Sequence, residues 1–137
     1  VKKRYEALLS GVVQQHGAAV DWQKQCISLP LRPDPYNRPL QVVDPTNGKT
    51  AVSHFALGHI ENWQQHISLW PLTGRTHQLR VHCAHPDGLG CPIAGDPLYG
   101  RGIAPTPSKR LCLHAAQLSF THPVSGKPMT FNSVVPF

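Results

Sequence analysis

The chain has 137 residues, which is enough for one hydrophobic core, so we expect a single domain over residues 1–137. Its formal net charge of +6 favours polyanionic partners but identifies none. The sequence lacks an apolar run of roughly 18 residues, a recognisable signal or transit peptide and any C-x-x-C pair, which argues against membrane, secreted and disulfide-rich proteins. We therefore expect a soluble cytoplasmic protein with reduced cysteines.

Fourteen prolines divide the chain into short elements, most of which read as strands. Residues 4–13 predict a strand that enters a turn, and residues 26–31 predict a second short strand. Three prolines between residues 33 and 39 indicate an extended surface loop. Residues 49–57 present alternating faces and are expected to pair with residues 66–72 in a hairpin. We expect residues 58–63 to form the loop of that hairpin.

A helix is predicted within TGRTHQLRVHCAH, residues 73–85. Thr73 or Thr76 is expected to cap its N-terminus, because a hydroxyl there accepts a hydrogen bond from a free backbone N–H. Leu79 and Cys83 are four residues apart and share an apolar face. This face is expected to pack on the core.

The C-terminal part of the sequence predicts two further strands. Residues 111–123 read as one strand, and a tight turn at Ser125-Gly126 leads into the last. Many strands with one helix indicate an α+β protein built on a mixed, mainly antiparallel β-sheet with few helices.

Arg75 follows Gly74 at the predicted junction of a strand and the helix, where its guanidinium can project into a cleft at the edge of the sheet. A permanently charged guanidinium can hold a carboxylate or a phosphate through two hydrogen bonds. The alternative is a solvated surface arginine. Farther along, Asp96 is expected to accept hydrogen bonds in a turn rather than act as a nucleophile, and Tyr99 to be a half-buried aromatic residue.

Three histidines, His77, His82 and His85, raise a metal hypothesis. His77 and His82 are five residues apart and point to different sides of a helix. His82 and His85, even with Cys83 or Cys91, match no standard zinc spacing. We expect these histidines to form hydrogen bonds with neighbouring loops, and we predict no metal.

Several segments together resemble one family. They are PLTGRTHQLRVH (residues 71–82), the pattern Gly90-x-Pro92-Ile93-x-Gly95-Asp96-x-x-Tyr99, and LCLHAAQLSFTHPVSGKPMTF (residues 111–131). This run resembles the C-terminal signature of the RluA-type pseudouridine synthases. Upstream, KKRYEALLSG (residues 2–11) is similar to the family's Lys-x-Tyr-x-Ala strand, and GKTAVSHF (residues 48–55) to its Gly-Lys-x-Ala-x-Thr-x-Tyr strand. The matches follow the family's order across nearly the whole chain.

The resemblance implies an isomerase that converts uridine to pseudouridine in ribosomal RNA or tRNA, with no metal or cofactor. The uridine is flipped out, the aspartate of a His-Arg-x-Asp motif attacks it, and the uracil turns and rejoins the ribose through C5. The loop DPYNRPLQ (residues 34–41) looks closest to the subgroup that modifies both RNAs. By position in the family motifs, Tyr5 stacks on the target base and assists proton transfer, Arg75 pairs with the catalytic aspartate, and Leu79 lines the pocket. Phosphate contacts are expected from Lys3 and Arg4, with Lys2, Arg101 and Arg110.

The chain departs from the family in one respect, since it contains no His-Arg-x-Asp motif. We therefore expect a fragment of the catalytic domain, truncated at its N-terminus, inactive by itself and without the nucleophile, which would precede Val1. A non-catalytic RNA-binding module is the alternative. A histidine-based metallohydrolase is a third hypothesis, which would require stoichiometric bound metal.

Overall fold

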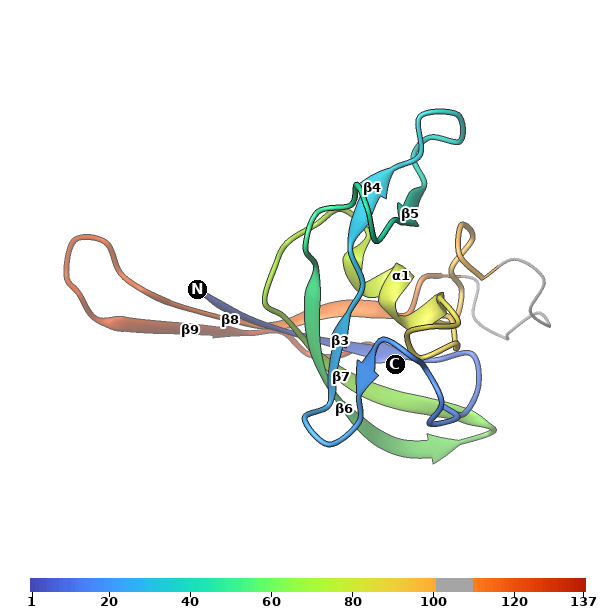
Figure 1. Cartoon of the computed structure of the whole chain (residues 1–137). Coiled ribbons are helices and arrows are strands. Elements are labelled where there is room, and N and C mark those ends of the chain that lie inside the picture. The colour runs from blue at the N-terminus through green and yellow to red at the C-terminus, as the bar shows by residue number, and fades with distance from the viewer. Residues whose placement is uncertain (101–109) are drawn as a thin grey trace.

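The computed structural model describes residues 1–100 and 110–137, which form a seven-stranded sheet, a separate two-stranded ladder and one short helix (Figure 1). In sheet order the strands are β2 (Val20–Asp21), β3 (Cys26–Ser28), β6 (Val52–Glu61), β7 (Gln64–Pro71), β1 (Lys2–Leu8), β8 (Leu113–Thr121) and β9 (Pro128–Asn132). The ladder pairs β4 (Leu31–Pro33) with β5 (Gln41–Val43), and the helix is α1 (Gln78–Ala84). The α+β class is confirmed, and every strand pair within these ranges is antiparallel.

Strand β1 is an interior strand of the sheet, between β7 and β8. Tyr5 is opposite Leu69 on one side and Ala115 on the other. Alternation along the strand puts Lys3, Tyr5 and Ala7 on one face. Ala7 is fully buried in the core, and Tyr5, on the same face of the strand, packs against the edge of that core.

The predicted hairpin is confirmed as β6 and β7, but its loop is shorter than expected. The strands continue to Glu61 and resume at Gln64, and only Asn62 and Trp63 turn the chain. Both have positive φ, 51° and 64°, the conformation that a two-residue turn requires to match the twist of the strands. A tryptophan rarely adopts this conformation, so the sequence did not indicate the turn.

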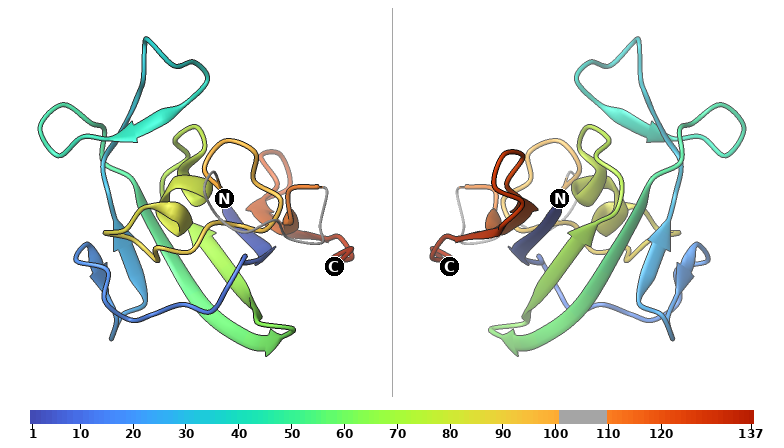
Figure 2. Two further views of the ribbon diagram at one scale, coloured as in Figure 1. Left: turned by 90° about the vertical axis from the view of Figure 1, so that its right-hand side faces the viewer. Right: turned by 90° about the vertical axis from the view of Figure 1, so that its left-hand side faces the viewer.

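Helix α1 packs against β6 and β7 on one side of the sheet (Figure 2). Leu79 and Cys83 are buried in the main apolar cluster, which also contains Ile67 and Leu69, as the helical spacing predicted. Strands β8 and β9 form a hairpin that projects beyond the body of the molecule (Figure 1). No helix within the described ranges is long and apolar enough to cross a membrane.

The start of the helix differs from the prediction. It begins at Gln78, and its N-cap is His77, in a left-handed conformation with φ 55° and ψ 17° and with no side-chain cap. Neither Thr73 nor Thr76 caps it. Thr73 accepts a hydrogen bond from Val52 N–H at 2.9 Å instead, so a contact with the sheet uses the hydroxyl that was expected to cap the helix.

All four cysteines are free, as expected for reduced thiols. Gly95, a residue of the family pattern, lies in a turn with φ +77°. A Cβ at this position would lie 1.9 Å from the carbonyl oxygen of Arg110, so only glycine fits.

Candidate active site

A cleft of about 690 Å³ opens between β1, the segment that leads from β7 into α1, and the start of β8. Four residues that the sequence singled out line it together: Lys3, Tyr5, Arg75 and Leu79. Arg4, Lys2 and Arg110, which were also expected to contact phosphates, are not among its lining residues, and Arg101 lies outside the described residues. The guanidinium of Arg4 pairs with Glu6 on the same strand. None of the lining residues within the described ranges is Asp or Glu.

The position of Tyr5 in the cleft follows from β1 and from an irregularity in its neighbour. The tyrosine is half-buried and packs against the core, whereas Lys3, on the same face, is exposed. Opposite them, β8 contains one extra residue, because Arg4 pairs with Gln117 while Tyr5 pairs with Ala115. Such bulges occur beside active sites, where they change the direction of a side chain.

Arg75 is exposed at the mouth of the cleft and is fixed at two points. Its Nε donates to the carbonyl oxygen of Thr50 at 2.9 Å, and its backbone N–H donates to Oε1 of Gln78 at 3.1 Å. Within the described ranges its terminal guanidinium nitrogens make no hydrogen bond and no ion pair. The side chain is therefore oriented but retains the donors with which an arginine binds a carboxylate or a phosphate.

Gln78 connects the loop that carries Arg75 to strand β6. Its Oε1 also accepts a hydrogen bond from Thr73 Oγ1 at 2.7 Å. Its Nε2 donates to the carbonyl oxygen of Val52 and to Oγ of Ser53, both at 2.9 Å. Because a backbone N–H must donate and a carbonyl must accept, these contacts determine the orientation of the amide. A single buried side chain thus fixes the loop on the sheet.

His82 continues this network into the core. Its Nε2 lies 3.0 Å from the carbonyl oxygen of Leu29, which can only accept, so Nε2 carries the proton. Its Nδ1 therefore accepts from Ser53 Oγ at 2.9 Å. Burial lowers the pKa of His82 to about 4, which keeps the ring neutral. The hydrogen bonds run in one direction, from Ser53 through His82 to Leu29.

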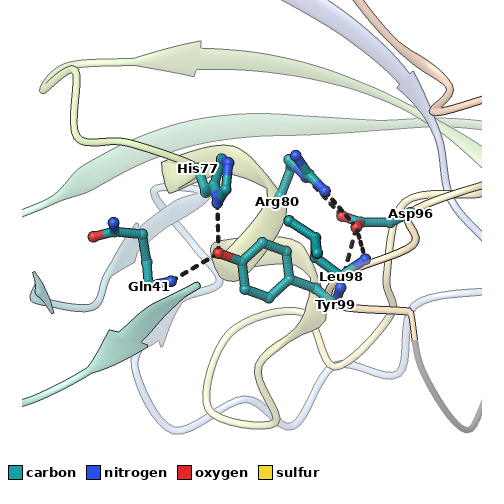
Figure 3. Close-up of polar contacts among 6 residues, drawn as sticks. All are labelled: Gln41, His77, Arg80, Asp96, Leu98 and Tyr99. Carbon is teal, nitrogen blue, oxygen red and sulfur yellow. Dashed lines mark hydrogen bonds and ion pairs between the residues drawn. The ribbon is translucent and has the colours of Figure 1, made fainter. Parts of the chain in front are cut away.

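A second network joins α1 to the segment after it (Figure 3). Arg80 donates to both carboxylate oxygens of Asp96, at 2.9 and 2.7 Å. Asp96 also accepts from the backbone N–H groups of Leu98 and Tyr99, as predicted for a turn residue. Burial alone would raise the pKa of Asp96, but the hydrogen bonds from Arg80 and from the backbone lower it. This carboxylate is ionised and fully occupied, so it is unsuited to act as a nucleophile.

Tyr99 lies at the centre of Figure 3. Its hydroxyl accepts from the backbone N–H of Gln41 at 3.0 Å and lies 2.7 Å from Nδ1 of His77. The guanidinium of Arg80 stands over the ring, 5.3 Å from its centre. Burial and the charge of Arg80 lower the pKa of His77, which also lines the cleft. The network therefore reaches the cleft through His77 and Arg80.

The chain matches no family model. It is 41% identical over 133 residues to the dual-specificity RNA pseudouridine synthase RluA of Haemophilus influenzae, covering 96% of this chain and 56% of that protein. With the protein of the same name from Haemophilus ducreyi it shares 43% identity over 133 residues, covering 96% of this chain and 57% of that protein. The chain is homologous to the RluA-type pseudouridine synthases. It spans about half the length of the curated relatives that it matches.

Solved structures agree with this relationship. The human RNA pseudouridylate synthase domain containing 1 superposes with a TM-score of 0.70 at 30% identity, covering 99% of this chain and 55% of that one. A second human protein, RNA pseudouridylate synthase domain containing 4, has a TM-score of 0.68 at 23% identity, covering 98% of this chain and 58% of that one, and supports the fold alone. The fold and the resemblance to the RluA-type family are confirmed.

The three histidines of the metal hypothesis do not meet in the folded chain. His77 contacts Tyr99, His82 contacts Ser53 and Leu29, and His85 accepts from the backbone of Asp87. Each forms hydrogen bonds with a neighbouring segment, as predicted.

A different group, His59, Glu61 and His66 on the β6–β7 hairpin, has ligand atoms within 4.8 Å of one another. The two imidazole rings are stacked, with centres 4.0 Å apart and planes inclined by 18°. The lone pairs of parallel rings run side by side and do not converge on one ion. The arrangement is therefore a stacked pair of rings beside a carboxylate.

Sequence reasoning missed the roles of three residues that organise the site. Gln78 and Arg80 were not singled out, and Tyr99 was named without its contact with His77. One signal was present, because Gln78 and His82 are polar residues four apart on the same helical face as buried apolar side chains. Polar residues at buried positions must be hydrogen-bonded, so this spacing indicates a buried network.

Proposed function

We propose that this chain is part of an RluA-type synthase that isomerises uridine to pseudouridine in ribosomal RNA or tRNA. The observation that carries the proposal is the cleft, which brings Tyr5 of β1 together with Arg75 and Leu79 from a distant segment. It has no acidic residue among its described lining residues. The names of the relatives support RNA as the partner. We propose that residues 1–137 act as one unit, and a cytoplasmic location stays a prediction.

The proposed roles follow from the geometry of the cleft. The half-buried ring of Tyr5 is fixed by β1 and can stack on a flipped base. Arg75 retains terminal nitrogens that suit the two oxygens of an aspartate. We propose that this aspartate is the nucleophile and that it comes from sequence outside the chain. Lys3, exposed on the same strand face, is placed to contact a phosphate.

The chemistry requires an exchange of bonds at the ribose and one proton transfer. The bond between C1′ and N1 breaks, a bond between C1′ and C5 forms, C5 loses its proton, and N1 gains one. No redox partner or cofactor enters this balance. Arg75 holds the carboxylate, whose bond to the nucleotide forms on attack and breaks again before the product leaves, and Tyr5 lies beside the base that moves.

The alternative is an RNA-binding module without catalysis, which the net charge of +6 also favours. Tritium release from 5-tritiated uridine in ribosomal RNA and tRNA separates the two functions. We would compare this chain with the protein expressed from its full gene. Release from the longer protein alone would support the synthase. RNA binding by both proteins with release from neither would favour the binding module.

A further inference from the structure

We propose that His77 binds the RNA directly, with its Nε2–H as a fixed donor to an acceptor oxygen of the target nucleotide, and that Tyr99 is the positioning residue that orients it. This inference rests on the proposed function and adds a substrate contact to the same cleft. His77 lines the cleft beside Arg75. Figure 3 shows its Nδ1 directed at the hydroxyl of Tyr99, with the second ring nitrogen on another side of the ring.

The direction of the hydrogen bond from Tyr99 to His77 follows from the donors available. The Tyr99 oxygen already accepts from the backbone N–H of Gln41. Its own proton has one acceptor within the described ranges, Nδ1 of His77 at 2.7 Å. Burial raises the pKa of Tyr99, so the hydroxyl remains protonated and donates. Nδ1 is then the acceptor, and the proton of the neutral imidazole must be on Nε2.

Nε2 of His77 has no hydrogen-bond partner among the described residues. A polar N–H at a cleft surface, fixed in direction by its ring, is a preorganised donor. Tyr99 is itself held firmly: it packs against the cluster of Leu31, Ala51 and Val81 and lies under the guanidinium of Arg80. The ring of His77 therefore cannot turn without breaking a bond to a well-anchored side chain.

The backbone supports a functional position for His77. Its left-handed conformation, φ 55° and ψ 17°, is uncommon for a residue with a Cβ; histidine adopts it more often than most such residues, and asparagine adopts it more readily still. Residues in such conformations cluster at functional sites when the surrounding structure stabilises them. If His77 had only to form the turn, asparagine would serve at least as well.

This contrast provides the test. In the full-length enzyme, His77→Asn suits the backbone but moves the donor away from the place of Nε2, whereas His77→Gln is worse for the backbone but restores a donor near it. We expect kcat/KM for tritium release to fall about tenfold in His77→Asn and distinctly less in His77→Gln. The opposite order, with His77→Gln the less active, would overturn the proposal.

A double-mutant cycle tests the positioning role of Tyr99. Tyr99→Phe removes the hydroxyl and leaves the ring. We expect kcat/KM to fall several-fold in the wild-type background and to change little in the His77→Ala background, because the hydroxyl acts through His77. Equal losses in both backgrounds would show that Tyr99 is only structural and would contradict the proposal.

The donor itself can be observed without activity, which separates this proposal from the proposed function. Nitrogen-15 spectra of the imidazole in this chain should show Nε2 protonated and Nδ1 unprotonated, and Tyr99→Phe should produce a mixture of tautomers.

Addition of a short uridine-containing RNA should shift the nitrogen-15 resonance of Nε2 of His77. Replacing the uridine by 4-thiouridine should reduce that shift if the acceptor is the base carbonyl, and a phosphorothioate should reduce it if the acceptor is the backbone. An Nδ1-protonated ring, or no shift with bound RNA, would refute the contact even in an active enzyme.

Discussion

Ser53 and His82 meet in the interior of the protein, where both residues are 0% exposed and Oγ of the serine lies 2.9 Å from Nδ1 of the histidine. One residue belongs to β6 and the other to α1, so the contact fixes the helix on the sheet. Every hydrogen bond in the network has a required direction. A proton added to Nδ1 of His82 would therefore remove an acceptor and bury a charge.

His82 should make the stability of the fold depend on pH. Its pKa is about 4 in the folded chain and about 6.5 in the unfolded chain, so the unfolded chain binds more protons between these values. We expect the free energy of unfolding to be highest above pH 6.5 and to fall by up to about 3 kcal/mol as the pH drops to 4. Urea unfolding at several pH values measures this. His82→Gln should flatten the curve in this window, whereas the exposed control His16→Gln should leave it unchanged; an unchanged curve in His82→Gln would contradict the assignment.

The ion pair of Arg80 and Asp96 should contribute far more to stability than the ion pair of Arg32 and Asp44. The side chains of the first pair are 14% and 0% exposed, and those of the second 41% and 17%. Arg80→Met leaves a buried carboxylate without its partner and should lower the free energy of unfolding by about 3 kcal/mol. The same substitution at Arg32 should cost less than about 1 kcal/mol. Urea unfolding measures both losses. Equal losses of unfolding free energy in the two variants would show that burial does not make the first ion pair more important.

Arg75 should be needed for turnover much more than for RNA binding. In the full-length protein, Arg75→Ala removes the proposed partner of the attacking carboxylate and should lower tritium release by roughly a hundredfold or more. RNA binding should weaken only modestly. The slope of log affinity against log salt concentration should change by about one released counterion at most. Because Arg75 is exposed, unfolding should be unaffected. Parallel loss of turnover and affinity would count against a catalytic role.

The ring and the hydroxyl of Tyr5 should have separable effects. Tyr5→Phe keeps the aromatic surface beside the core, so RNA affinity and stability should stay near those of the wild type while turnover falls. Tyr5→Leu also removes the stacking surface and should weaken RNA binding by about 1–3 kcal/mol. Fluorescence anisotropy with a uridine-containing RNA and tritium release measure the two effects. A Tyr5→Phe enzyme with normal turnover would exclude proton transfer by the hydroxyl.

Sequence periodicity was enough to predict the α+β class, the β6–β7 hairpin and the buried face of α1, because alternation and helical spacing are local properties. The family motifs singled out Tyr5, Arg75 and Leu79, and its basic side chain singled out Lys3. The fold brings these four residues together in one cleft. Their catalytic and binding roles stay predictions.

Tertiary contacts account for what the sequence did not indicate. Thr73 is a residue type that often caps a helix. In the folded chain, however, its hydroxyl accepts a hydrogen bond from the backbone N–H of Val52 and donates one to Oε1 of Gln78. The role of Arg80 depends on Asp96, which follows it by sixteen positions across a loop. Such partners become neighbours only when the chain has folded, and local patterns do not contain them.

The interior position of β1, between β7 and β8, constrains the order in which the sheet can assemble. Hairpins β6–β7 and β8–β9 join segments that are adjacent in the sequence, so each can close soon after it is synthesised. β1 is made before both and has to wait for β7 and β8, its neighbours on either side. Pairing between such distant segments is slow because a long loop must close first. We therefore expect Tyr5 and Arg75 to come to face one cleft at a late step of folding, when the first strand joins the two hairpins into one sheet.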